Sequence, residues 1–196
     1  MSEVITALQQ ACRAGALSET AVHFAGLLAR LDPKADRSVL LAGALAAERA
    51  LSGDVCVDLE SIAGGIVLEG DSGGDLVSPD FEKWQQALWN CPLVSDGGHL
   101  SPLVLTDDGR LYLYRYHALE CRLAQAVGRY ARPASHSADA SLRAEGLDTL
   151  FPDDPGSADQ RAAAAKAVDQ HLLVISGGPG TGKTATVVRI LALFHQ

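Results

Sequence analysis

The sequence lacks the features that mark membrane and secreted proteins. No apolar run in its 196 residues approaches the roughly 20 residues that are needed to span a bilayer. The amino terminus carries Glu3 and has no basic segment ahead of an apolar one, which excludes the pattern of a secretory leader. Aromatic residues make up only 5% of the chain, and its apolar residues are mostly Ala, Leu and Val. We therefore expect a helix-rich cytoplasmic protein without a membrane partner.

Cysteine spacing of the metal-binding kind is also absent. Cys12, Cys56, Cys91 and Cys121 lie far apart, without a CxxC pair and without a histidine at ligand spacing. A zinc site is therefore not expected, and the pattern favours buried free thiols.

Most of the chain has no excess of basic residues, which DNA-binding surfaces use to neutralise phosphates. Residues 1–160 carry 12 basic and 23 acidic side chains, a net charge of −11, whereas residues 161–196 carry four basic and one acidic, a net charge of +3. The acidic part favours a protein partner over DNA, although an acidic surface can also serve solubility alone.

What the sequence does contain is a complete phosphate-binding loop, or P-loop. Four residues separate Gly177 from the Gly182-Lys183-Thr184 run, which is the P-loop spacing. Glycines permit positive φ angles and let backbone N–H groups approach phosphate oxygens. Lys183 is expected to reach the β- and γ-phosphates of a nucleoside triphosphate, and Thr184 to ligate the Mg²⁺ that bridges them. The predicted nucleotide-binding residues of the loop are Gly177, Gly178, Pro179, Gly180, Thr181, Gly182, Lys183 and Thr184.

The segments on either side of the loop have the required character. The apolar run at residues 172–175 predicts a buried parallel strand. After the loop, one face of a predicted helix is apolar, at Val187, Ile190, Leu191 and Phe194. Strand, loop and helix follow in the order that a phosphate site needs, which disfavours a chance match in a glycine-rich turn.

Gln160 has two interpretations. Ser157 is placed to cap an alanine-rich helix over residues 161–168, and Gln160 three residues later fits a capping box. Alternatively, the Gln160 amide offers both a donor and an acceptor to the N6 and N7 positions of adenine. The residues alone favour the cap.

The rest of the chain is predicted to be mainly helical. The third helix is apolar nearly all round and should be central, and Asp108-Gly109 should form the turn of a hairpin. Trp84, together with Trp89 or Leu88, should pack in the core, although an exposed tryptophan could instead anchor a partner. The predicted elements are helices at residues 2–14, 19–31, 38–51 and 80–90, a short strand at 55–59, a loop over 64–80, a β-hairpin at 102–115, and a helix at 117–130 with Leu119, Leu123 and Val127 as its apolar stripe. Residues 1–130 would form one domain, 131–156 a linker with a short helix at about 142–151, and 157–196 the start of another domain.

Several stretches resemble the RecD helicases, the α subunit of bacterial exodeoxyribonuclease V (RecBCD). Those near the P-loop are Phe151-Pro152, Asp159-Gln160 and residues 174–184, and those in the amino-terminal half are residues 22–25, 40–50, 55–59 and 109–113. In that helicase group a glutamine ahead of the loop recognises adenine, which favours the second interpretation of Gln160. The resemblance implies an ATP-driven 5′→3′ DNA translocase that acts with RecB- and RecC-like subunits in DNA recombination and repair, with a partner-docking domain ahead of its motor.

The fold class that follows is a mainly α amino-terminal domain with a small β-hairpin, and then the first β–P-loop–α unit of a truncated α/β RecA-like NTPase domain. Hydrolysis also needs a second carboxylate and an arginine, and residues 185–196 supply no Asp-Glu pair. We therefore expect an amino-terminal part of a longer helicase, with little activity alone and with its DNA contacts elsewhere. The alternatives are a non-enzymatic assembly module, or another P-loop enzyme such as a kinase or an AAA-type ATPase.

Overall fold

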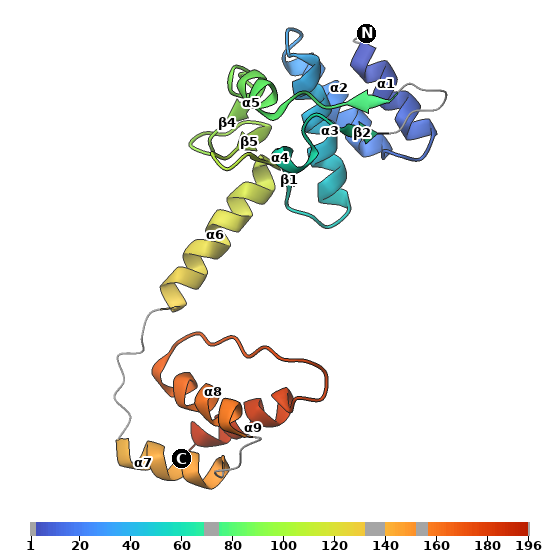
Figure 1. The fold of residues 1–196 in the computed structure, drawn as a ribbon. Helices are drawn as coiled ribbons and strands as arrows, with labels where there is room; N and C mark the ends of the chain where they lie inside the picture. The colour runs from blue at the N-terminus through green and yellow to red at the C-terminus, as the bar shows by residue number, and fades with distance from the viewer. Residues whose placement is uncertain (1–2, 69–74, 132–139, 152–156, 196) are drawn as a thin grey trace. The chain divides into compact units, whose positions relative to one another are not determined.

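Two units make up the chain, and the division between them falls inside one helix. The computed structural model describes residues 3–68, 75–131, 140–151 and 157–195. The first unit covers residues 1–121 and the second residues 122–196, so that helix α6 (Tyr114–Tyr130) belongs to both. The elements of each unit are labelled in Figure 1.

Three helices open the first unit, as the sequence predicts. They are α1 (Glu3–Arg13), α2 (Glu19–Leu31) and α3 (Arg37–Leu51). The hydroxyl of Ser18 accepts a hydrogen bond from the N–H of Ala21 at 3.2 Å, which confirms Ser18 as the cap of α2. After α3, Gly53 takes a φ of +95°, the conformation that commonly follows the end of a helix.

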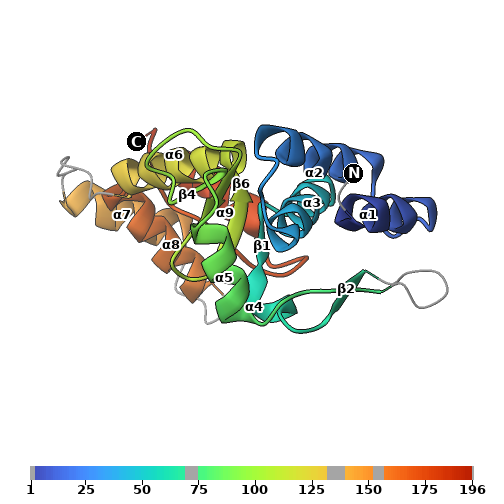
Figure 2. The same ribbon diagram turned by 90° about the horizontal axis from the view of Figure 1, so that it is seen from above.

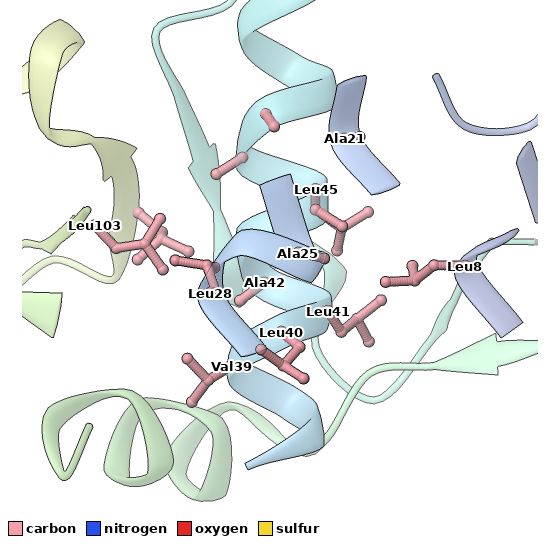
Figure 3. Packing of buried hydrophobic residues seen from close by; sticks show 14 of the residues in the cluster. Leu8, Ala21, Ala25, Leu28, Val39, Leu40, Leu41, Ala42, Leu45 and Leu103 are labelled. Carbon is pink, nitrogen blue, oxygen red and sulfur yellow. The ribbon is translucent and has the colours of Figure 1, made fainter. Parts of the chain in front are cut away.

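Helix α3 occupies the centre of the first unit. Every residue from Ser38 to Ala47 is buried, because α1, α2, α5 and strands β1 and β6 all pack against it. Figure 3 shows leucines of α1, α2 and α3 pointing toward one another, with Leu103 reaching the same core from the sheet. The central position of α3 was therefore predicted correctly from the apolar residues on nearly all sides of the helix.

A four-stranded sheet completes the first unit. Its order is β1 (Cys56–Asp58), β6 (Arg110–Leu113), β5 (Leu103–Leu105) and β4 (Val94–Ser95). Strands β5 and β6 form the predicted antiparallel hairpin, and Gly109 in its turn has a φ of +80°. Strand β4, which pairs with β5 in parallel, was not predicted, because two residues are too short to show a pattern.

The predicted loop over residues 64–80 is wrong in part. It contains β2 (Ile66–Leu68) and β3 (Leu76–Val77), which pair in antiparallel fashion, and residues 69–74 lie outside the described residues. Seen from above in Figure 2, β2 lies apart from β6, in keeping with its separate two-stranded sheet. The many glycines of this region indicated a loop more strongly than five strand residues could indicate strands. The short helix α4 (Leu59–Ile62) precedes this ribbon.

Helix α5 (Phe81–Trp89) closes one side of the core. Trp84 is fully buried, and its indole N–H donates to the carbonyl oxygen of Ser38 at 2.9 Å, which joins α5 to the first turn of α3. This confirms the core position predicted for Trp84. Trp89, by contrast, is 39% exposed.

Helix α6 begins three residues earlier than predicted, at Tyr114. Its stripe of Leu119, Leu123 and Val127 is exposed, and no side chain of the helix is buried. The stripe pattern is therefore present without the core packing that such a pattern usually indicates. The cysteines also differ from expectation, because Cys91 is buried while Cys121, on α6, is exposed; all four are free thiols.

Among the described residues of the second unit, the three helices that follow α6 surround a small core. Helices α7 (Ala140–Leu150), α8 (Ala158–Asp169) and α9 (Lys183–Leu193) pack against one another. Their shared cluster consists of Leu147, Phe151, Ala164, Ala167, Ile190 and Leu193. Within the described residues of both units, no helix is long and apolar enough to cross a bilayer.

Candidate functional site

The P-loop connects an extended segment to the amino terminus of α9 (Figure 1). Gly180 and Gly182 have φ angles of +78° and +76°, a region that side-chain-bearing residues rarely adopt. Gly177 is required for a different reason. A Cβ atom at this position would lie 2.8 Å from the hydroxyl oxygen of Thr181. Three glycines of the predicted loop therefore have a physical role in its conformation.

Hydrogen bonds within the loop hold it in a curve. The Thr181 hydroxyl donates to the carbonyl of Gly178 at 2.9 Å. The Lys183 ammonium donates to the carbonyls of Gly177 and Gly178, both at 2.7 Å. Lys183 therefore reaches back across the loop from the first turn of α9.

The amino terminus of α9 has no side-chain cap. Its N-cap residue, Gly182, accepts the first helical hydrogen bond, from the N–H of Thr186 at 2.9 Å, but has no side chain to accept others. The N–H groups of the first turn in such a helix are available to an anion, and the helix dipole favours negative charge there. Thr184 lies in this turn and is exposed.

A cavity of about 520 Å³ lies beside the loop. Four of the predicted site residues line it, namely Gln160, Gly177, Thr181 and Lys183. Gly178, Pro179, Gly180, Gly182 and Thr184 are not among the lining residues, although they belong to the same loop or to its junction with α9. The remaining lining residues are Asp159, Ala163, Val174, Ile175, Ser176 and Thr186.

Gln160 approaches the loop from the first turn of α8. Its amide nitrogen donates to the backbone carbonyl of Thr181 at 3.3 Å. Ser157 is the N-cap residue of α8, as predicted, but its side chain makes no capping hydrogen bond. Its φ and ψ of −109° and −1° are not the extended angles that a capping side chain needs. The Gln160 side chain thus faces the P-loop, while its recognition of adenine stays a prediction.

The strand predicted at residues 172–175 is wrong for this structure. The segment is extended without strand pairing, and Val174 is 80% exposed. A strand requires a neighbour for its backbone hydrogen bonds, and none of the described strands pairs with this segment. The order of segments around the loop is as expected, but the strand itself is not formed.

The apolar face predicted for α9 is also wrong in most of its members. Ile190 is buried, whereas Val187, Leu191 and Phe194 are 44%, 62% and 59% exposed. The face that packs on α7 and α8 consists of Thr186, Ile190 and Leu193. Thr186 was missed because a hydroxyl does not signal burial, yet its Oγ1 donates to the carbonyl of Gly182 at 3.0 Å and satisfies its polar group.

Two family descriptions match the chain, one in each of its two units. The description "RecBCD enzyme subunit RecD, N-terminal domain" matches residues 13–112, which lie in the first unit.

The chain belongs to the RecD family. This confirms the resemblance seen in the sequence. The second description, "AAA domain", matches residues 160–196, a range that begins at Gln160 and includes the whole P-loop.

Curated RecD proteins align along most of the chain. The RecBCD enzyme subunit RecD of Mycolicibacterium smegmatis is 40% identical over 177 residues, which are 89% of this chain and 29% of that protein. The subunit of Mycobacterium tuberculosis (strain H37Rv) is 40% identical over 187 residues, 94% of this chain and 29% of that protein. The subunit of Haemophilus influenzae is 31% identical over 121 residues, which are 59% and 18%. The chain thus spans under a third of the length of these RecD proteins.

Proposed function

We propose that this chain is the part of an ATP-dependent DNA helicase subunit that combines a partner-docking domain with the ATP-binding loop. The observation that carries this proposal is the second unit's loop, in which Lys183, the uncapped first turn of α9 and the cavity beside Gln160 adjoin one another. Membership of the RecD family supports the same activity.

Most loop residues would have a role in holding ATP. The backbone N–H groups of Gly177, Gly178, Gly180, Thr181 and Gly182 would surround the phosphates, whereas Pro179 has no N–H to offer, and Lys183 would bond the β- and γ-phosphates. To do so, the Lys183 ammonium exchanges one of its two carbonyl partners for a phosphate oxygen, or uses its third N–H. Gln160, which lines the same cavity, would then contribute to recognition of the base.

Mg²⁺ would be held with the nucleotide. The Thr184 hydroxyl fits this role, because it is exposed in the first turn of α9 and an oxygen ligand suits Mg²⁺. The metal would neutralise charge that develops on the phosphates during transfer to water. An extended segment, the loop and α9 also follow in the order of the first β–P-loop–α unit of a RecA-like domain, and we propose this fold for the complete motor.

We propose that the first unit binds a protein partner. The relatives are named subunits of a RecBCD enzyme, so RecB- and RecC-like subunits are the partners that fit. Residues 1–121 carry 8 basic and 17 acidic side chains, and this net charge of −9 is unsuited to a general DNA surface and suited to a basic protein surface. We propose DNA contacts, translocation and a role in DNA repair only for a protein as long as the RecD relatives.

The helicase assignment is tested by measuring ATP hydrolysis stimulated by single-stranded DNA, in a protein as long as the RecD relatives. Lys183→Gln should abolish stimulated hydrolysis, whereas Lys166→Gln, an exposed lysine of α8 outside the cavity, should not. A rate without DNA stimulation, or Lys183→Gln as fast as the unaltered protein, would refute the helicase assignment. Retained binding to partner subunits without any hydrolysis would instead support the assembly-module alternative.

A further inference from the structure

Gln160 contacts the P-loop itself and not only the space where a base would lie. Its amide nitrogen is 3.3 Å from the carbonyl oxygen of Thr181. The same nitrogen would be 2.9 Å from a Cβ atom built on Gly182. The side chain therefore lies directly against the two loop residues that precede Lys183, and its contact needs the absence of a side chain at Gly182.

The helix turn that carries Gln160 is held in place by its neighbour. The Arg161 guanidinium donates to the carbonyls of Leu147 and Phe151 at 3.2 and 2.8 Å, and it pairs with the carboxylate of Asp148. These bonds join the first turn of α8 to the last turn of α7. Gln160 consequently projects toward the loop from a fixed turn, which is the requirement for one side chain to position another segment.

The Thr181 carbonyl lies between two features that shape the loop. Gly180 and Gly182, on either side of it, both have positive φ angles. The Thr181 hydroxyl meanwhile bonds to Gly178 within the loop. A hydrogen bond to the carbonyl of Thr181 therefore fixes the peptide between the two left-handed residues, and with it the direction of the N–H groups that follow.

We propose that Gln160 is a positioning residue for the P-loop, acting through the Thr181 carbonyl on the affinity for polyphosphate whatever the base. The proposal rests on the proposed ATP-binding function and adds a role that recognition of adenine does not include. A glutamine that only reads adenine affects ATP and leaves a ligand without a base untouched. A glutamine that holds the loop affects every polyphosphate equally.

The experiment compares three ligands, each with Mg²⁺: inorganic tripolyphosphate, ATP and GTP. Dissociation constants are measured by titration calorimetry on the full chain, in the unaltered form and as Gln160→Ala and Gln160→Met. The methionine is similar in length and adds no charge beside the anionic ligands, but it cannot donate to the Thr181 carbonyl. Gln170→Ala is the matched control, because Gln170 follows the other end of α8 and lies outside the cavity.

Both Gln160 variants should weaken all three ligands by a similar factor of roughly 3- to 10-fold, the effect of one hydrogen bond, and Gln170→Ala should change none. Circular dichroism must show unchanged helix content, which separates a loop effect from unfolding. Weaker ATP binding with unchanged tripolyphosphate binding would overturn the proposal and leave Gln160 as a base reader only. Unchanged binding of all three ligands would overturn it as well. If the unaltered chain binds neither tripolyphosphate nor ATP, the proposed function itself fails, and this inference fails with it.

Discussion

A glycine at the centre of α3 gives a direct test of how tightly α2 and α3 pack. Gly43 is buried, and a Cβ atom at this position would lie 2.3 Å from Cδ1 of Leu28 on α2. Leu28 is itself fully buried and cannot move into solvent. The same Cβ would also lie 3.6 Å from Phe24 and 3.7 Å from Leu103. Gly43→Ala therefore places a methyl group in space that is already filled.

Two opposing effects decide the sign of this substitution. Alanine in place of glycine in a helix interior is worth about 0.8–1.0 kcal/mol of stability. An extra carbon in a filled core costs about 1–3 kcal/mol. We expect the packing cost to be larger, so that Gly43→Ala destabilises the first unit by about 1 kcal/mol. Gly26→Ala on α2 is the matched control, because its Cβ would meet only the Arg30 guanidinium at 3.7 Å, an ordinary contact. It should stabilise by about 0.5–1 kcal/mol.

The assay is urea unfolding followed by tryptophan fluorescence. Both tryptophans, Trp84 and Trp89, belong to the first unit, so the signal follows that unit alone. In a Leu28→Ala background the clashing atom is absent, and Gly43→Ala should become stabilising. If Gly43→Ala and Gly26→Ala raise the free energy of unfolding equally in the unaltered background, the close packing of α2 on α3 is refuted.

Two further predictions concern the first unit. Trp84→Phe should lower the free energy of unfolding by about 1–3 kcal/mol, because it removes buried volume and the hydrogen bond to the Ser38 carbonyl. The control Trp89→Phe should change the free energy of unfolding by less than about 0.5 kcal/mol. Equal losses for the two variants in urea unfolding would contradict this prediction. Contacts with the Ser38 hydroxyl and N–H lower the pKa of Asp36, the cap of α3. The contribution of Asp36 to stability is complete above the unfolded pKa of about 4 and is lost as the pH falls through the lower folded pKa. Asp36→Asn should therefore make the free energy of unfolding fall less steeply with pH on the acid side. An unchanged slope there would argue against the cap.

The sequence predicted the helices of the first unit well because their signals are local. A Ser18 cap, the apolar circumference of α3 and the turn at Gly109 each act within a few residues. Strands β2, β3 and β4 have two or three residues each and depend on partners elsewhere in the chain. No local pattern distinguishes such strands from a glycine-rich loop.

The sequence predicted the conformation of the P-loop better than the packing of the helices around it. Glycine spacing specified the positions that need positive φ, and Gly180 and Gly182 have it. The burial of Thr186 and the exposure of Val187 and Leu191 depend on which helices α9 meets, and periodicity does not contain that information. The bond from Gln160 to the loop was not foreseen either, because it depends on the direction of a side chain across 21 residues of sequence.

We propose that the loop of this chain binds ATP through Lys183. The most direct test is a calorimetric titration of the chain with ATP and Mg²⁺, alongside Lys183→Gln and the control Lys166→Gln. We predict saturable binding that weakens by about 10- to 100-fold in Lys183→Gln, since a charged hydrogen-bond donor is lost, and that persists in Lys166→Gln. No saturable binding to the unaltered chain, or equal affinity in Lys183→Gln, would contradict the claim.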